Sequence, residues 1–92
     1  MEDAQIVWTD YMKFRLKLRG FDLDKVDYIL RYSSERYVDT VTGRRIAVGK
    51  HKQFLVIIPY EMEGNLLTPI TIHVTSRQQI NFRLKSGRFG NE

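Results

Sequence analysis

Histidine, glutamate and arginine side chains can cleave RNA without a metal ion, and the four best placed for this in the sequence are His73, Arg77, Arg45 and Glu61. That reaction needs a base for the 2′-hydroxyl, an acid for the 5′-oxygen, and cations for the negative charge that grows on phosphorus. His73 or Glu61 would move protons, Arg77 would stabilise the charge on phosphorus, and Arg45 would fix the phosphate. The competing interpretation is a solvated face that carries an ordinary surface histidine and scattered charges.

The four side chains can meet only if strands present them on one face of a sheet. Alternate residues of a strand share a face, so a strand over residues 68–75 would project His73 from the face opposite its apolar residues. Arg77 follows that strand, beside a helix N-terminus that favours phosphate. Glu61 closes the neighbouring strand and Arg45 lies on a preceding one. We therefore expect one basic sheet face that carries all four.

The segment from Arg77 to Arg88 contains no acidic residue. Three interpretations of this segment compete: a solvated terminal helix, a clamp for nucleic acid, or the edge of a basic active site. The residues that we expect to contact RNA are Arg83, Lys85, Arg88, Arg19 and Arg15.

Length and composition indicate one small folded domain. The chain has 92 residues, is 42% hydrophobic and 28% charged, and carries a net charge of +4, which suits either a polyanionic partner or ordinary solubility. It has no cysteine, no segment that resembles a signal peptide, and no apolar run long enough to span a membrane, so we expect a cytoplasmic protein. The two histidines have no partners at ligand spacing, so neither a metal nor a cofactor is expected.

Two helices are predicted in the first third of the chain. Thr9 can cap a first helix that Gly20 ends, although the strict alternation of residues 12–19 favours a strand; the residue types decide for a helix. Within that helix Arg15 and Arg19 fall in an apolar arc, where they must snorkel, form pairs or line a pocket. A second helix should begin at Asp22 or Asp24 and end at Ser33 and Ser34.

The remainder predicts strands and a final helix. Strands are expected at residues 36–41, 45–48, 54–60 and 68–75, followed by a helix that begins after Thr75 or Ser76 and ends at Gly87. Short connections predict an α+β fold with a four-stranded antiparallel sheet over residues 36–75 and the helices on one face. Residues 1–6 and 89–92 are expected to be frayed. The first two helices should pack on the sheet through Trp8, Met12, Leu16, Val26, Ile29 and Leu30.

Three segments together resemble BrnT-type toxins of the RelE-like ribonuclease superfamily: VWTDYMKFRLKLRGFDLDKV, DTVTGRRIAVG and ITIHVTSRQQINFR. The resemblance covers roughly residues 6–89 in order and depends on the order and spacing of loose motifs. It implies two helices, a sheet and a C-terminal helix, with cleavage of mRNA as the activity and an antitoxin protein as the partner.

Some residues of this chain match the family's motifs and others differ from them. Arg77 stands where the family has the arginine of Ser-Ala-Arg, and Arg45 matches the arginine after the turn. Arg19 and Leu18 replace a histidine and a lysine, and Ile72 replaces an arginine of the fourth strand. These departures concern catalysis more than fold.

Three functions are therefore weighed. The first is a toxin-like, metal-independent endoribonuclease of a type II toxin–antitoxin system that cleaves mRNA, including mRNA on the ribosome. The second is a non-catalytic nucleic-acid-binding module, and the third is a domain that only contacts proteins. Salt-dependent binding would separate the third from the others, and RNA cleavage would separate the first from the second.

Overall fold

The computed structural model describes residues 2–91, and its three helices begin after residues whose side chains cap them. Thr9 accepts a hydrogen bond from the Met12 amide (3.1 Å), and Ser76 accepts one from the Gln79 amide (3.2 Å). Asp22 accepts one from the Asp24 amide at 2.9 Å. Each cap satisfies an amide that has no partner inside the helix. The helices are α1 (Asp10–Arg19), α2 (Leu23–Tyr32) and α3 (Arg77–Lys85).

Helix α1 confirms the choice of helix over strand for residues 12–19. Only Met12 and Leu16 of this helix are buried, and they lie one turn apart on the side that faces the sheet. Phe14 and Leu18, which complete the apolar alternation in the sequence, are exposed. Gly20 ends the helix at a φ of 73°, in the left-handed region that glycine adopts without strain.

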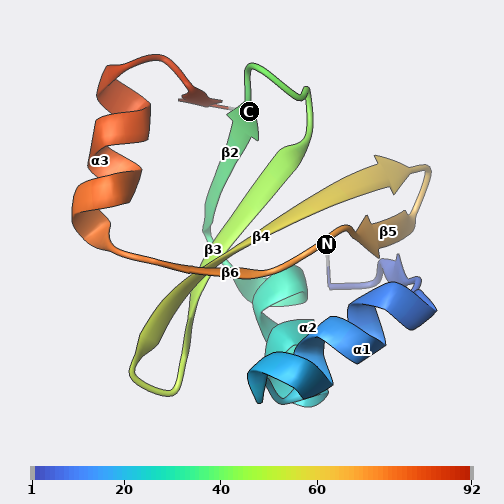
Figure 1. The fold of residues 1–92 in the computed structure, drawn as a ribbon. Helices are drawn as coiled ribbons and strands as arrows, with labels where there is room; N and C mark the ends of the chain where they lie inside the picture. Colours follow the sequence, from blue (N-terminus) through green and yellow to red (C-terminus); the bar gives the residue numbers. More distant parts are fainter. Residues whose placement is uncertain (1, 92) are drawn as a thin grey trace.

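Seven strands among the described residues form one mixed sheet (Figure 1). Strands β5, β4, β3 and β2 are neighbours in that order and antiparallel; β7 lies antiparallel to β2, and β1 lies parallel to β5. The strands are β1 (Gln5–Ile6), β2 (Glu35–Asp39), β3 (Arg45–His51), β4 (Phe54–Glu63), β5 (Leu66–Pro69), β6 (His73–Thr75) and β7 (Phe89–Asn91).

The α+β class is confirmed, but the predicted four-stranded antiparallel sheet is wrong in detail. The strand predicted over residues 68–75 is interrupted: β5 and β6 both pair with β4, and residues 70–72 between them belong to neither strand, although the Ile70 amide still donates to the Pro59 carbonyl at 2.8 Å. The termini predicted to be frayed instead add strands at residues 5–6 and 89–91, while residues 1 and 92 lie outside the described part. These terminal strands are two and three residues long, so they depend on pairing with distant partners rather than on local preference.

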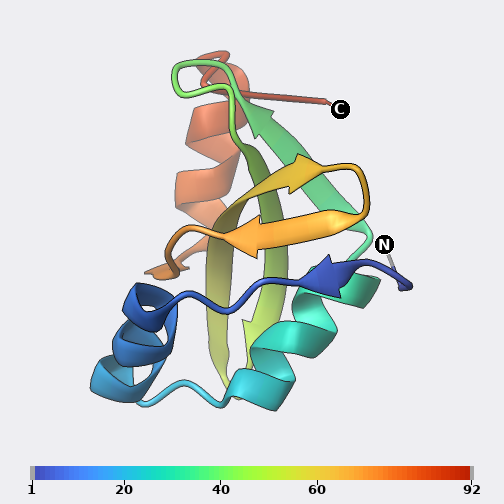
Figure 2. The ribbon, with the colours of Figure 1, turned by 90° about the vertical axis from the view of Figure 1, so that its right-hand side faces the viewer.

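Helices cover both faces of the sheet, and the prediction that all of them pack on one face is wrong. Helices α1 and α2 lie against one face and α3 against the other (Figures 1 and 2). The reason is the apolar composition of the central strands on both faces. On β4, Val56 and Ile58 belong to the core under α1 and α2, whereas Ile57 between them belongs to the core under α3.

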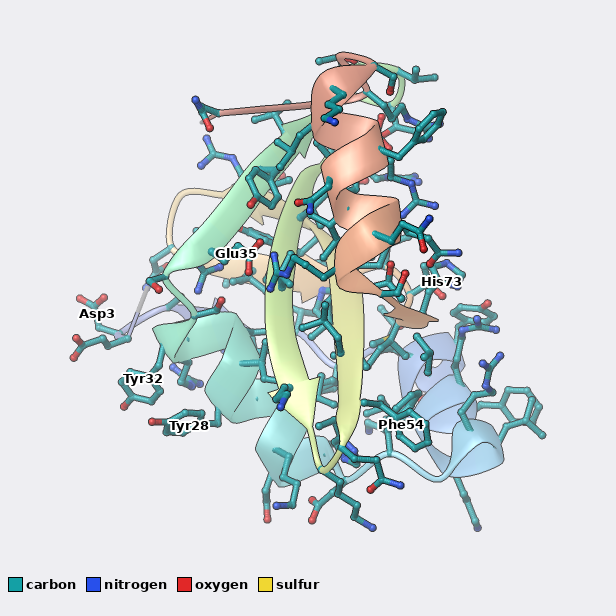
Figure 3. The ribbon with its side chains drawn as sticks, turned by 90° about the vertical axis from the view of Figure 1, so that its left-hand side faces the viewer. Asp3, Tyr28, Tyr32, Glu35, Phe54 and His73 are labelled. Atoms are coloured by element: carbon teal, nitrogen blue, oxygen red, sulfur yellow. The ribbon has the colours of Figure 1, made fainter. Side chains whose placement is uncertain are left out.

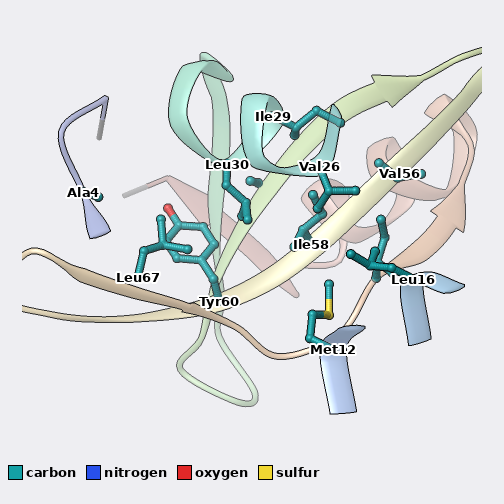
Figure 4. Close-up of a cluster of buried hydrophobic side chains, with 12 residues drawn as sticks. Ala4, Met12, Leu16, Val26, Ile29, Leu30, Val56, Ile58, Tyr60 and Leu67 are labelled. Atoms are coloured by element: carbon teal, nitrogen blue, oxygen red, sulfur yellow. The ribbon is translucent and has the colours of Figure 1, made fainter. Parts of the chain in front are cut away.

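The larger core lies between the sheet and helices α1 and α2 (Figure 4). Trp8 packs against this core, as do all the other residues predicted to join the first two helices to the sheet. Tyr60 is fully buried in it and its hydroxyl accepts a hydrogen bond from Arg36 at 3.1 Å. Arg36 also donates to the carbonyls of Leu30 and Ser33, so this arginine joins the end of α2 to the sheet.

Candidate nucleic-acid interface

The four predicted catalytic side chains do not meet, because Arg45 lies on the wrong face. Residues paired across neighbouring strands share a face. His73 pairs with Ile57, which belongs to the core under α3. Arg45 pairs with Tyr60, which belongs to the core under α1 and α2. Arg45 and His73 therefore point to opposite sides of the sheet, and the prediction that they converge is wrong.

Arg77 is also held apart from His73. Its guanidinium donates to both carboxylate oxygens of Glu35 on β2, at 2.5 and 3.1 Å. Glu35 and His73 lie on either side of α3 when the molecule is viewed from the α3 face (Figure 3). The hydrogen bond from Arg77 is the main cause that lowers the pKa of Glu35. Arg77 thus serves an ion pair on the far side of the helix from His73.

Glu61 does share the α3 face with His73. It is four residues beyond Ile57 on β4, so alternation returns it to the same side, about 13 Å along the strand from the residue paired with His73. Its carboxylate forms an exposed ion pair with Arg44, at 3.3 Å. Of the predicted catalytic set, only Arg45 lies on the other face; His73, Glu61 and Arg77 share the α3 face, but Arg77 is held at Glu35, away from His73.

A hollow of about 250 Å³ lies on this face, beside α3. We call it the α3 cleft. Its most basic members are Arg44, Arg83 and Arg88, and the imidazole of His73 lines it as well. The complete lining is Asp39, Thr42, Arg44, Ile46, Ile57, Pro59, Thr71, His73, Arg83, Arg88 and Phe89.

Arg44 is a cleft residue that the sequence did not identify. The sequence offered the pair Arg44–Arg45 at the start of a strand, and neighbours in a strand point to opposite faces. The following residues, Ile46 and Ala47, are both apolar and both buried. They gave no indication of which arginine faces which side, and the prediction chose the wrong member of the pair.

The arginines of the cleft differ in how fully their charge is neutralised. Arg88 donates to both carboxylate oxygens of the buried Asp39, at 2.7 and 2.9 Å. Arg44 pairs with the exposed Glu61. Arg83 lies over the ring of Phe89, 5.5 Å from its centroid, and contacts no carboxylate among residues 2–91. Arg83 is therefore the cation of the cleft best able to bind an incoming anion.

Arg15 reaches His73 from the other layer of the fold. Its guanidinium donates to the Ile72 carbonyl from Nε (3.2 Å) and from a terminal nitrogen (3.1 Å), and that terminal nitrogen also lies 3.2 Å from His73 Nδ1. The sequence left open whether Arg15 snorkels, forms a pair or lines a pocket, and here it pairs. The carbonyl that it contacts belongs to the interruption between β5 and β6.

This contact fixes the chemical state of the imidazole. An arginine has donors and no acceptor, so His73 Nδ1 must accept and carry no proton. The neutral ring then carries its proton on Nε2, the nitrogen left for a ligand in the cleft. Burial, followed by the charges of Arg15, Arg19 and Arg83, lowers the pKa of His73 below its ordinary value of 6.5. At neutral pH His73 is therefore an uncharged hydrogen-bond donor.

The remaining residues predicted to contact RNA lie outside the cleft. Arg19 is exposed at the end of α1 and acts on His73 only through its charge. Lys85 is exposed on α3 and lines a shallow groove beside Phe82. Arg83 and Arg88 line the cleft as described.

Comparison with protein families, with curated proteins and with solved structures finds no match to this chain. Between residues 2 and 91 no helix is long and apolar enough to cross a membrane. The same part of the chain contains no group of three or more His, Cys, Asp or Glu side chains that could hold a metal ion.

The Asp39–Arg88 pair predicts a specific loss of stability in acid. Arg88, with help from the amides of Thr42 and Val41, lowers the pKa of Asp39 from 3.8 to about 2. Because the folded pKa lies below the unfolded one, the stabilisation is present above pH 4 and is lost as the pH falls through about 2. Urea unfolding should show that Asp39→Asn removes about 2 kcal/mol at neutral pH, with the gap to wild type closing near pH 2. The exposed Asp3→Asn variant should follow wild type, and a gap that is independent of pH would contradict the assignment.

Nitrogen-15 NMR of the histidines tests the state of His73. At neutral pH we expect its proton on Nε2 and a titration midpoint below 6.5. Arg15→Met should raise that midpoint, because it removes both the nearest cation and the donor to Nδ1. A proton on Nδ1 in the wild-type protein would show that the contact with Arg15 does not form in solution.

Proposed function

We propose that this protein binds RNA in the α3 cleft and cleaves mRNA there without a metal ion, as a RelE/BrnT-like toxin that an antitoxin silences in the cytoplasm. The observation that carries the proposal is the gathering of Arg44, Arg83 and His73 around one hollow of the α3 face. The order of two helices, sheet and C-terminal helix agrees with the resemblance in the sequence, although the sheet here has more strands than expected.

The size of the cleft suits a phosphodiester. Pockets that enclose a whole small molecule usually measure about 300–1,000 Å³, and this cleft measures about 250 Å³. It can hold a phosphate and part of its sugar, but the bases must lie outside. Arg83 supplies the positive charge at its wall, and the Nε2 proton of His73 can donate to a phosphoryl oxygen.

The roles in cleavage differ from those that the sequence suggested. Attack of the 2′-oxygen on phosphorus forms one P–O bond and breaks the bond to the 5′-oxygen, leaving a cyclic phosphate and a 5′-hydroxyl. Glu61, an exposed carboxylate on this face that pairs with Arg44 of the cleft, can accept the 2′-hydroxyl proton, and solvent protonates the 5′-oxygen. Arg83 takes the charge-stabilising role expected of Arg77, and Arg44 takes the phosphate-fixing role expected of Arg45.

A non-catalytic RNA-binding module is the second candidate, and two observations favour it. Arg45 and Arg77 are turned away from the cleft. In addition, Arg15 occupies the lone pair of His73 Nδ1, so the ring offers a proton donor rather than a base. Both candidates share the RNA-binding cleft and differ only in chemistry.

A surface for a protein partner is also present, as an antitoxin requires. Tyr11, Phe14 and Leu18 are all more than half exposed on α1, on the side away from the sheet. Their spacing of three and four residues places them in one stripe of the helix. This stripe is the surface that we propose an antitoxin covers.

Removal of the Arg83 charge should weaken RNA binding and its dependence on salt. We expect Arg83→Gln to lower the affinity for single-stranded RNA of any sequence and to reduce the slope of log K against log salt by about 0.7, the contribution of one phosphate contact. Fluorescence anisotropy across a series of NaCl concentrations measures both quantities. Lys17→Gln, which removes an exposed charge from α1, is the matched control and should change neither. Salt-independent binding by the wild type would rule out the proposed cleft.

Cleavage of mRNA in the presence of a chelator tests the chemistry. Arg83→Gln should slow cleavage by about 10²–10³-fold, because it removes the charge beside the phosphorus. Glu61→Gln should slow it as well, whereas Arg45→Gln should not, because Arg45 lies on the other face. Gel analysis with and without ribosomes gives the rates. If the wild type binds RNA but never cuts it, the non-catalytic candidate is correct.

A further inference from the structure

The outward face of α3 carries an exposed aromatic side chain that the fold does not need. Phe82 is 70% exposed, whereas Ile80, two residues earlier, is fully buried under the helix. Two residues turn an α-helix by about 200°, so Phe82 points almost directly away from the sheet. A single exposed apolar side chain is ordinary in itself, so its surroundings decide whether it has a role.

Two grooves lie beside Phe82, and apart from Phe82 itself the residues that line them are of polar or basic types. One measures about 510 Å³ and the other about 490 Å³. Gln78 and Phe82 line both. The first is lined by Gln78, Gln79, Phe82, Arg83, Ser86 and Arg88, and the second by Gln78, Asn81, Phe82 and Lys85.

The first groove continues the α3 cleft. Arg83 and Arg88 line both hollows, so a strand whose phosphate lies in the cleft can pass over these arginines onto the outer face of α3. The surface along this route favours a polyanion: Asp39, the acidic residue of the cleft lining, is neutralised by Arg88, and residues 64–91 contain no aspartate or glutamate. An anionic chain is therefore the occupant that the charges favour.

We propose that Phe82 is a stacking platform for a base of single-stranded RNA whose phosphate lies in the α3 cleft, with the amides of Gln78 and Asn81 beside the edge of that base. The inference rests on the proposed RNA-binding function. It adds a binding site for the base, since the cleft is too small to hold one. Aromatic side chains bind unpaired bases of any sequence through their faces, and amides can donate to or accept from base edges. A duplex would not use this platform, because its bases are already stacked.

The test compares oligonucleotides with and without bases. Phe82→Ala should weaken binding of single-stranded RNA by about 5- to 150-fold, the usual range for loss of one stacked base. It should leave the salt slope unchanged, because no phosphate contact is lost. Binding of an abasic oligonucleotide with the same backbone should be the same for Phe82→Ala and wild type. Phe82→Trp should retain the affinity for single-stranded RNA.

Tyr28→Ala is the matched control, because Tyr28 is 65% exposed on α2, on the opposite side of the sheet. It should bind RNA as wild type does. If Phe82→Ala binds single-stranded RNA with wild-type affinity and wild-type salt dependence, the platform is wrong while the cleft stands. If it weakens the abasic oligonucleotide equally, Phe82 acts through the fold and the platform is again overturned. If the wild type binds no RNA, the proposed function itself fails.

Discussion

Strand β4 is apolar on both of its faces, and the rest of the structure follows from the need to cover both. Val56 and Ile58 must be shielded on one side and Ile57 on the other, at a gain of about 1.5–3 kcal/mol for each fully buried side chain. Helices α1 and α2 cover the first side. Residues 2–91 contain one further helix, α3, and its buried residue Ile80 covers the second side. The α3 cleft exists because that single short helix shields only part of its face, which leaves polar and basic residues exposed beside it.

Helix positions could be predicted from the sequence because their signals are local. Thr9 and Ser76 are capping residues whose effect extends over one turn, and Gly20 stops α1 through its own backbone freedom. The sheet depends on distant pairing, so less of it could be predicted. The terminal strands at residues 5–6 and 89–91 are too short to show a periodic pattern. The side of the sheet to which Arg45 points could not be predicted either. Ile46 and Ala47 are both apolar and both buried, so the sequence shows no alternation from which that side could be read.

The net charge of +4 overstates how much positive charge is available to a ligand. Several arginines hold the fold together instead. Arg36 donates to two carbonyls at the end of α2, and Arg31 donates to the carbonyls of Glu2 and Ala4 as well as to Asp27. Arg77 and Arg88 form two-point contacts with carboxylates. A basic segment therefore indicates a binding site only through those cations that are not already engaged in structural contacts. In the C-terminal third these cations are Arg83, in the cleft, and Lys85, on the outer face of α3.

Arg15 connects the two layers of the molecule, and it does so at the interruption between β5 and β6. A continuous strand would have used the Ile72 carbonyl in the ladder. The break releases that carbonyl toward α1, and β6 pairs only with β4 in the described chain, so its other side is an edge that Arg15 can reach. Once there, the guanidinium also sets the proton of His73 on Nε2. The position of α1 on one face of the sheet thus determines the hydrogen-bonding character of the cleft on the other.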